Sequence, residues 1–220
     1  MNGLGSLKLK WPWGSNSTDS DLNKDMPSTE NSPNWRVAII SSLSILFALL
    51  MLGWYWSQEP EPFHVPTTYQ GEPEQVTGVV TTATLISVVD ILLEKPGGYL
   101  ANDFLPHGVW LDNLPNWEFG VLVQVRDLSK AMRESFSRSQ SQSTEDADLA
   151  LAEPRFNVNH TSWAVPWPES EYSEGSEHLE NYLKRLTDEE DYNGQFFARA
   201  DNLSYWLATV ETRLGSLSQR

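Results

Sequence analysis

The stretch VAIISSLSILFALLMLGWYW, residues 37–56, contains no charged side chain. An α-helix of this length measures about 30 Å, which matches the hydrocarbon core of a lipid bilayer. A helix buried inside a soluble domain is the alternative, but such a helix normally carries a polar stripe. The polar side chains here are three serines, whose hydroxyls can bond back to helix carbonyls. The stretch therefore predicts one transmembrane helix.

The flanks of this stretch indicate that it is not removed after synthesis. A cleavable signal peptide has a shorter apolar region and small residues at its exit. Here 36 residues precede the apolar run, and the chain leaves it through Trp54, Tyr55 and Trp56. Because aromatic rings favour the headgroup level of a bilayer, these three residues predict the outer end of the span.

Basic residues near the span predict its orientation, because Lys and Arg are retained in the cytoplasm. Lys8, Lys10, Lys24 and Arg36 precede the span, and no Lys or Arg follows it before Lys95. Arg36 directly abuts the apolar run and is the strongest determinant. We therefore expect a cytoplasmic N-terminus and residues 57–220 on the outer side.

Charge and cysteine content exclude several classes of function. Residues 1–56 carry four basic and four acidic side chains, so the whole net charge of −15 falls on residues 57–220. An acidic surface repels phosphate backbones, so nucleic acid is not an expected partner. The chain has no cysteine, which excludes disulfides, thiolate metal sites and cysteine nucleophiles.

The predicted fold class is all-α: an N-terminal disordered tail, one transmembrane helix and an extracytoplasmic helical bundle. Residues 1–36 are polar and form the disordered cytoplasmic tail, while residues 57–78 contain four prolines and read as a spacer. Residues 79–220 form the helical domain. Its first helix runs from Val79 to a stop at Pro96, although the β-branched residues of this segment would also suit a strand. The second carries an apolar face at Trp117, Val121, Val125, Leu128, Met132 and Phe136.

Two further helices follow. Ser143 and Asp146 resemble the start of a short helix that Pro154 ends, and Pro166 and Pro168 bar regular structure before a helix that begins near Ser170. In the helix that begins near Ser170, the apolar positions are Leu179, Leu183 and Leu186.

The C-terminal helix has the most regular pattern, with apolar residues alternating in steps of four and three at Phe196, Ala200, Leu203, Leu207, Val210, Leu214 and Leu217. This repeat is typical of a coiled-coil seam. We expect its first half to pack on the preceding helix and on the helix of residues 121–136. The second half, Val210, Leu214 and Leu217, remains as a possible interaction seam, and we expect the natural chain to continue past Arg220.

Catalytic and metal-binding patterns are weak. The possible bases are His64, His107, His160 and His178, and no serine lies in a Gly-x-Ser-x-Gly turn. Glu174 and His178 are four residues apart on a predicted helix, yet exposed acidic helices produce such pairs by chance. We therefore expect no enzyme activity, no cofactor and no metal.

Two clusters keep a functional alternative open. Trp163, Trp167 and Tyr172 lie near Glu169, Glu171 and Glu174, and aromatic platforms beside acids suit a glycan-cleaving cleft. A solvated acidic helix with a packed aromatic entrance explains the same residues, and burial of the rings would exclude the cleft. Asp103, His107 and Asp112 lie in one predicted loop, where structural use in caps and turns is favoured.

The segments KPGGYLANDFLPHGVWLDNLPNWEFGVLVQVRDL, RSQSQSTEDADLALAEPRFN and FFARADNLSYWLATVETRLGSLSQR resemble the bacterial family called domain of unknown function 2333. The resemblance extends from about Trp54 to Arg220. It implies a short cytoplasmic tail, one span in the inner membrane of a Gram-negative bacterium and a mostly helical periplasmic region. It implies no activity.

These observations lead to two hypotheses. The first is a membrane-tethered interaction or scaffold module of the cell envelope, with the lipid bilayer and an unidentified protein as partners. The alternative is a periplasmic glycan-binding or glycan-cleaving domain.

Overall fold

The computed structural model describes residues 34–65, 68–69, 72–73, 76–103, 113–139, 144–188 and 193–218. The chain separates into two compact units, residues 1–45 and 46–220. Nearly all of the expected cytoplasmic tail lies outside the described residues. The first unit therefore contributes Asn34 and the beginning of helix α1, and all other described elements belong to the second unit.

Helix α1 (Trp35–Trp56) covers the predicted span and adds two residues before it. The buried residue of this helix is Gly53. Apart from Trp56, the large apolar side chains of α1 are exposed, unlike those of a core helix. Within the described part of the chain, α1 is the helix that is long and apolar enough to cross a membrane.

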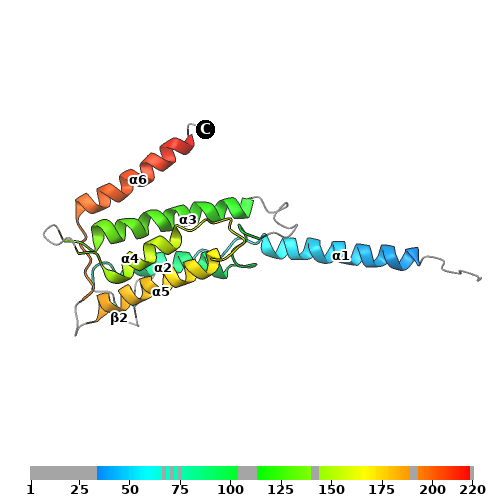
Figure 1. Ribbon diagram of the computed structural model, residues 1–220, viewed down its shortest axis with the longest axis horizontal. Helices are drawn as coiled ribbons and strands as arrows, with labels where there is room; N and C mark the ends of the chain where they lie inside the picture. The colour runs from blue at the N-terminus through cyan, green and yellow to red at the C-terminus, as the bar shows by residue number, and fades with distance from the viewer. Residues whose placement is uncertain are drawn as a thin grey trace, which may run out of the picture. The chain divides into compact units, whose positions relative to one another are not determined.

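Four helices of the second unit form an antiparallel bundle, which confirms the all-α fold class (Figure 1). They are α2 (Val79–Glu94), α3 (Asn113–Ala131), α4 (Ala147–Phe156) and α5 (Pro168–Thr187). Helix α2 packs against α3 and α5, and α4 also packs against both, so the four helices close a ring around one core. The largest fully buried apolar side chains of this core are Tyr172, Tyr182, Phe156, Leu92, Leu122, Met132, Leu149 and Leu179.

Two prolines behave differently from the sequence-based expectation. Pro154 does not end α4 but lies inside it, and the helix continues to the fully buried Phe156. Pro168 does not precede α5 but begins it, because a proline at the first helical position gives up an N–H that would have no partner anyway. Asp146 caps α4 as expected, accepting from the backbone N–H groups of Asp148 at 3.0 Å and Leu149 at 3.2 Å.

In the first half of α3 the buried face is displaced by one residue from the predicted one, whereas Val125 is buried as predicted. Leu122 and Glu118 are fully buried, whereas Trp117 is exposed and Val121 is half-buried. The apolar pattern could not locate this part of the face, because a charged residue, Glu118, lies on it. The helix then passes into a π-helical turn, η2 (Met132–Phe136), which buries Met132 and Phe136 as predicted.

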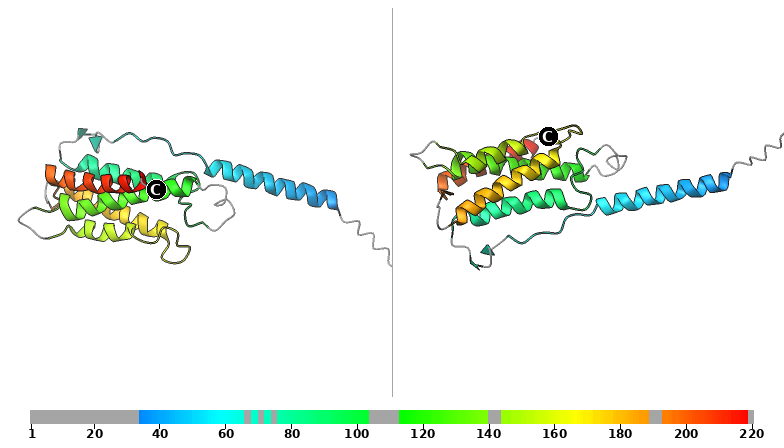
Figure 2. Two further views of the ribbon diagram at one scale, coloured as in Figure 1. Left: turned by 90° about the horizontal axis from the view of Figure 1, so that it is seen from above. Right: turned by 60° about the horizontal axis from the view of Figure 1, so that its bottom comes forward.

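The structure describes residues 57–65, 68–69, 72–73 and 76–78 of the predicted spacer. Residues 57–65 run beside α2 (Figure 2). Phe63 lines a shallow hollow together with Val88, Trp117 and Val121. Further along, two-residue strands β1 (Thr68–Tyr69) and β2 (Glu72–Pro73) pair antiparallel, with Thr68 opposite Pro73.

The C-terminal helix α6 (Ala200–Ser218) starts later than the heptad pattern predicts, and it lies along α3 rather than along α5. Residues 193–199 have no regular structure, because they carry the chain from the end of α5 to the outer side of α3. The Tyr182 hydroxyl donates to the Gln195 carbonyl oxygen at 2.7 Å, and the Phe197 N–H donates to the Phe136 carbonyl oxygen at 2.6 Å. Phe196 stacks on Phe136 with ring centroids 5.0 Å apart.

Candidate functional site: the two faces of α6

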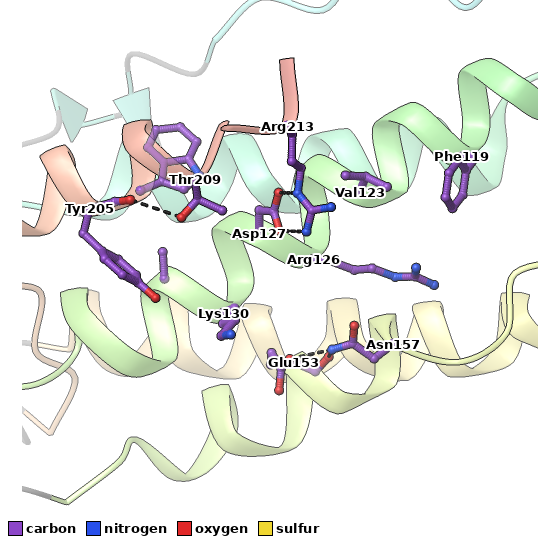
Figure 3. A pocket seen from close by; sticks show the side chains of 12 residues that line it. Phe119, Val123, Arg126, Asp127, Lys130, Glu153, Asn157, Tyr205, Thr209 and Arg213 are labelled. Carbon is purple, nitrogen blue, oxygen red and sulfur yellow. Dashed lines mark hydrogen bonds and ion pairs between the residues drawn. The ribbon is translucent and has the colours of Figure 1, made fainter. Parts of the chain in front are cut away.

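A cleft of about 380 Å³ lies between α6 and the bundle (Figure 3). Helix α3 contributes its floor, α4 one wall and α6 the other. Its charged and polar lining consists of Arg126, Asp127, Lys130, Glu153, Asn157, Tyr205, Thr209 and Arg213.

One ion pair fastens α6 across this cleft. The Arg213 guanidinium binds Asp127 on α3 through two bonds, and the Nη2–Oδ1 distance is 2.7 Å. Figure 3 shows the arginine reaching down from α6 to this carboxylate. Asp127 is buried, so its charge depends on this partner, and a paired guanidinium supplies a planar two-point contact.

Two other charged groups of the cleft, Arg126 and Glu153, also have structural partners. Arg126 donates to the carbonyl oxygens of Phe156 at 2.5 Å and Val158 at 2.8 Å, where α4 ends. Glu153 is paired with Arg133 at 2.8 Å. These contacts join α4 to α3 and η2, and together with the Arg213 ion pair they make the cleft the seat of α6.

The π-helical turn η2 completes this seat. A π turn moves backbone carbonyls out of the usual α-helical hydrogen-bond pattern, and here two of them face the incoming chain. Ser135 accepts from the Asn202 side-chain amide at 2.9 Å, and Phe136 accepts from Phe197. Asn202 is the residue of α6 that is classed as buried.

The second face of α6 is only partly covered by protein within the described chain. An α-helix turns by about 100° per residue. The side of α6 that faces α3 therefore carries Asn202, Trp206, Thr209 and Arg213. The heptad residues lie about a quarter turn away from this side. Val210 is half-buried. The exposed leucines of this seam are Leu203 (45 %), Leu207 (50 %), Leu214 (59 %) and Leu217 (63 %).

A different polar cluster closes the end of the bundle where α2 stops. Lys95 and Glu118 form an ion pair whose side chains are fully buried, and Lys95 also donates to the Gly98 carbonyl oxygen. Glu118 accepts from the backbone N–H groups of Leu100 at 2.9 Å and Ala101 at 2.7 Å. Burial raises the pKa of the Glu118 carboxyl, against the opposing effect of Lys95 and these two donors. The cluster fixes the turn that follows α2.

The proposed metal pair does not share a partner. The Glu174 carboxylate lies 2.9 Å from the Arg155 guanidinium, while His178 Nδ1 lies 3.5 Å from Asp148. No group of three potential metal-binding side chains occurs within the residues that the structure describes. Asp103 follows the turn after α2, whereas His107 and Asp112 lie outside the described residues.

The aromatic residues of the glycan hypothesis do not form one platform. Tyr172 is fully buried and stacks edge-on against Tyr99 at 5.5 Å, whereas Trp163 and Trp167 are exposed. The nearby acids are also engaged. Glu169 accepts from Asn102 at 3.0 Å and Glu171 is paired with Arg155 at 2.6 Å.

The residues that predict membrane orientation lie at the two ends of α1. Arg36 is exposed in its first turn. Trp54 and Tyr55 are exposed at its other end, whereas Trp56 is half-buried and packs against Leu100 and Leu114.

Comparison with known proteins places the chain in a family. A family model described as an uncharacterized protein conserved in bacteria (DUF2333) matches residues 28–220. The chain belongs to DUF2333. No curated protein and no solved structure matches this DUF2333 chain. The match includes α1, the four-helix bundle and both faces of α6.

Sequence reasoning missed the residues that position α6. Asp127 and Arg213 are far apart in sequence, so no local pattern links them. Glu118 carried a usable signal, because it stands between Leu114 and Leu122 in steps of four and therefore on their face. A charge on that face predicts a buried partner, which is Lys95.

Proposed function

We propose that this DUF2333 protein is a single-pass inner-membrane protein whose periplasmic bundle presents α6 to a helical protein partner in the cell envelope. The observation that carries the proposal is the seam of Leu203, Leu207, Leu214 and Leu217, which remains exposed although the neighbouring face of α6 is fastened to α3. Apolar residues in alternating steps of four and three suit one type of occupant, a second helix with the same repeat.

The membrane part of the proposal has its own support. Helix α1 has the length and composition of a span. The basic residues Lys8, Lys10, Lys24 and Arg36 all precede it, and retention of such residues in the cytoplasm leaves the bundle outside. Trp54 and Tyr55, exposed at the other end, suit the outer headgroup level.

We further propose that the role is binding rather than catalysis. The ionisable groups around the cleft hold helices together, and those near Trp163 and Trp167 are paired with Arg155 or Asn102. The glycan alternative gains no observation in its favour, because its third aromatic residue, Tyr172, belongs to the core.

Site-specific photocrosslinking tests the seam, because the chain has no native cysteine. A benzophenone maleimide is attached to the seam through Leu214→Cys or Leu217→Cys. The matched control is Thr212→Cys, which is exposed on the opposite face of α6. We expect both seam positions, but not the control, to yield an adduct in intact membranes. Mapping of the adduct should place the label on an apolar heptad position of a helix.

An adduct of twice the chain mass identifies the partner as a second copy. The proposal fails if the seam positions give no adduct, or if Thr212→Cys gives the same adduct in equal yield. A charged residue at the neighbouring seam position, Leu207→Glu, should remove the adduct if the seam itself makes the contact.

A further inference from the structure

An uncharged, aromatic loop projects from one end of the bundle. Residues 156–168 contain no Asp, Glu, Lys or Arg in a domain that carries the whole net charge of −15. Near the tip of this loop, Trp163 (68 %), Val165 (81 %) and Trp167 (52 %) are exposed. Exposed tryptophans on a strongly acidic protein need a reason, because water does not favour them.

The loop lies at the same end of the bundle as the last turn of α1. Trp56 packs against Leu100 and Leu114, and the side chain of Trp56 approaches Gly97 so closely that a Cβ there would lie 2.6 Å from it. The same turn contacts the loop, because the Tyr99 hydroxyl donates to the His160 carbonyl oxygen at 3.2 Å. Asn102 donates to Glu169, two residues after Trp167. Residues 95–103 therefore connect Trp56 to the aromatic loop.

We propose that the loop of Trp163, Val165 and Trp167 is a second membrane-contact site, which inserts into the headgroup region of the bilayer that α1 spans. Tryptophan favours this depth, because its ring is apolar and its N–H can still reach water or headgroups. The loop offers no cation to anionic lipids, so apolar burial rather than charge attraction drives the contact.

Two features suit the loop to this role. His160 stacks on Phe119 with centroids 4.4 Å apart, and burial together with the Arg126 charge lowers its pKa, so this ring stays neutral at pH 7. Hydrogen bonds from Tyr99, Asn102 and Arg126 hold the base of the loop. The tip can therefore contact the bilayer without the entropic cost of ordering a free segment. The contact would orient the bundle, and with it the α6 seam, relative to the bilayer.

This inference rests on the proposed membrane anchor, and spin labelling can test the two separately. Single cysteines are introduced into the full chain, which is reconstituted in nanodiscs of phosphatidylcholine and phosphatidylglycerol. Val165→Cys reports on the loop, Leu46→Cys on α1, and Lys184→Cys on the far end of α5, sixteen residues or about 24 Å beyond its first residue. The measurement is the relative accessibility of each label to oxygen, which partitions into lipid, and to a water-soluble nickel chelate.

We expect the oxygen-to-nickel accessibility ratio at Val165→Cys to exceed that at Lys184→Cys at least about threefold, and to approach that at Leu46→Cys. A ratio at Val165→Cys equal to that at Lys184→Cys, with Leu46→Cys in lipid, overturns this inference and leaves the anchor intact. If Leu46→Cys is also in water, the anchor and the loop contact both fail. Replacing Trp163 and Trp167 by serine should lower the ratio at Val165→Cys without changing that at Leu46→Cys.

Discussion

At the scale of single residues, the buried pair of Lys95 and Glu118 is the interaction on which the turn after α2 depends. Both side chains are fully buried, and Glu118 also holds the backbone of Leu100 and Ala101. Removing one partner leaves the other as an uncompensated buried charge, which costs about 3 to 5 kcal/mol. Local sequence patterns indicate each residue separately, but not that they meet.

The two single substitutions, Lys95→Met and Glu118→Gln, should differ in how pH changes the unfolding free energy that each one removes. In Lys95→Met, Glu118 loses its cation, so its pKa rises further above the ordinary value of 4.5. The folded state then binds a proton more tightly than the unfolded state, and the loss of unfolding free energy should shrink as pH falls. In Glu118→Gln, the buried Lys95 ammonium is left without a counter-ion, and because added protons cannot neutralise an ammonium group, the loss should not shrink as pH falls.

Urea titration of the full chain in detergent micelles, followed by far-ultraviolet circular dichroism between pH 5 and 9, measures both variants. The double variant Lys95→Met with Glu118→Gln is the control, and it should recover part of the loss with a weak pH dependence. Parallel pH profiles for the two single variants would show that the pair is not ionised as described.

At the scale of elements, α6 shows what a periodic pattern can and cannot predict. The heptad positions correctly predict an apolar stripe on a helix, because a helix places every third and fourth residue on one side. They do not show which side meets the domain. The choice is made by Asn202 and Arg213, whose partners lie on η2 and α3 and cannot be read from spacing.

Other elements show the same division between local signals, which the sequence contains, and contacts with other elements, which it does not show. Local signals such as the Asp146 cap were sufficient to start α4, and Gly97 with Gly98 adopt the positive φ angles that a turn after α2 requires. The face of α3 depends instead on Lys95, which lies on another element. The sequence therefore predicts the helices well and their contacts poorly.

Substitutions in two leucines should separate the core from the seam. Leu179→Ala removes a fully buried side chain and should lower the unfolding free energy by about 2 to 5 kcal/mol. Leu207→Ala trims a half-exposed side chain of the seam and should change it by less than about 0.5 kcal/mol in the isolated protein. Denaturant titration measures both values. A large loss at Leu207 in a protein shown to be monomeric would mean that the seam belongs to the core.

At the scale of the whole molecule, the proposed function depends more on amino-acid composition than on any single site. The uncharged, apolar residues 37–56 and the acidic residues 57–220 have opposite solvent preferences, and the sequence alone therefore predicts that a membrane surface separates them. Membership in DUF2333 gives the chain its relatives, while the exposed seam and the aromatic loop give the bundle two surfaces with a proposed use.

The side of the membrane on which the bundle lies is the claim that the account needs most, because both proposed contacts depend on it. Cysteine labelling in intact cells with a permeabilised outer membrane tests it, using a membrane-impermeant maleimide and the otherwise cysteine-free chain. Lys184→Cys in α5 should react before the inner membrane is broken, and Ser17→Cys in the N-terminal tail should react after it is broken. Immediate labelling of Ser17→Cys with protection of Lys184→Cys would contradict the account.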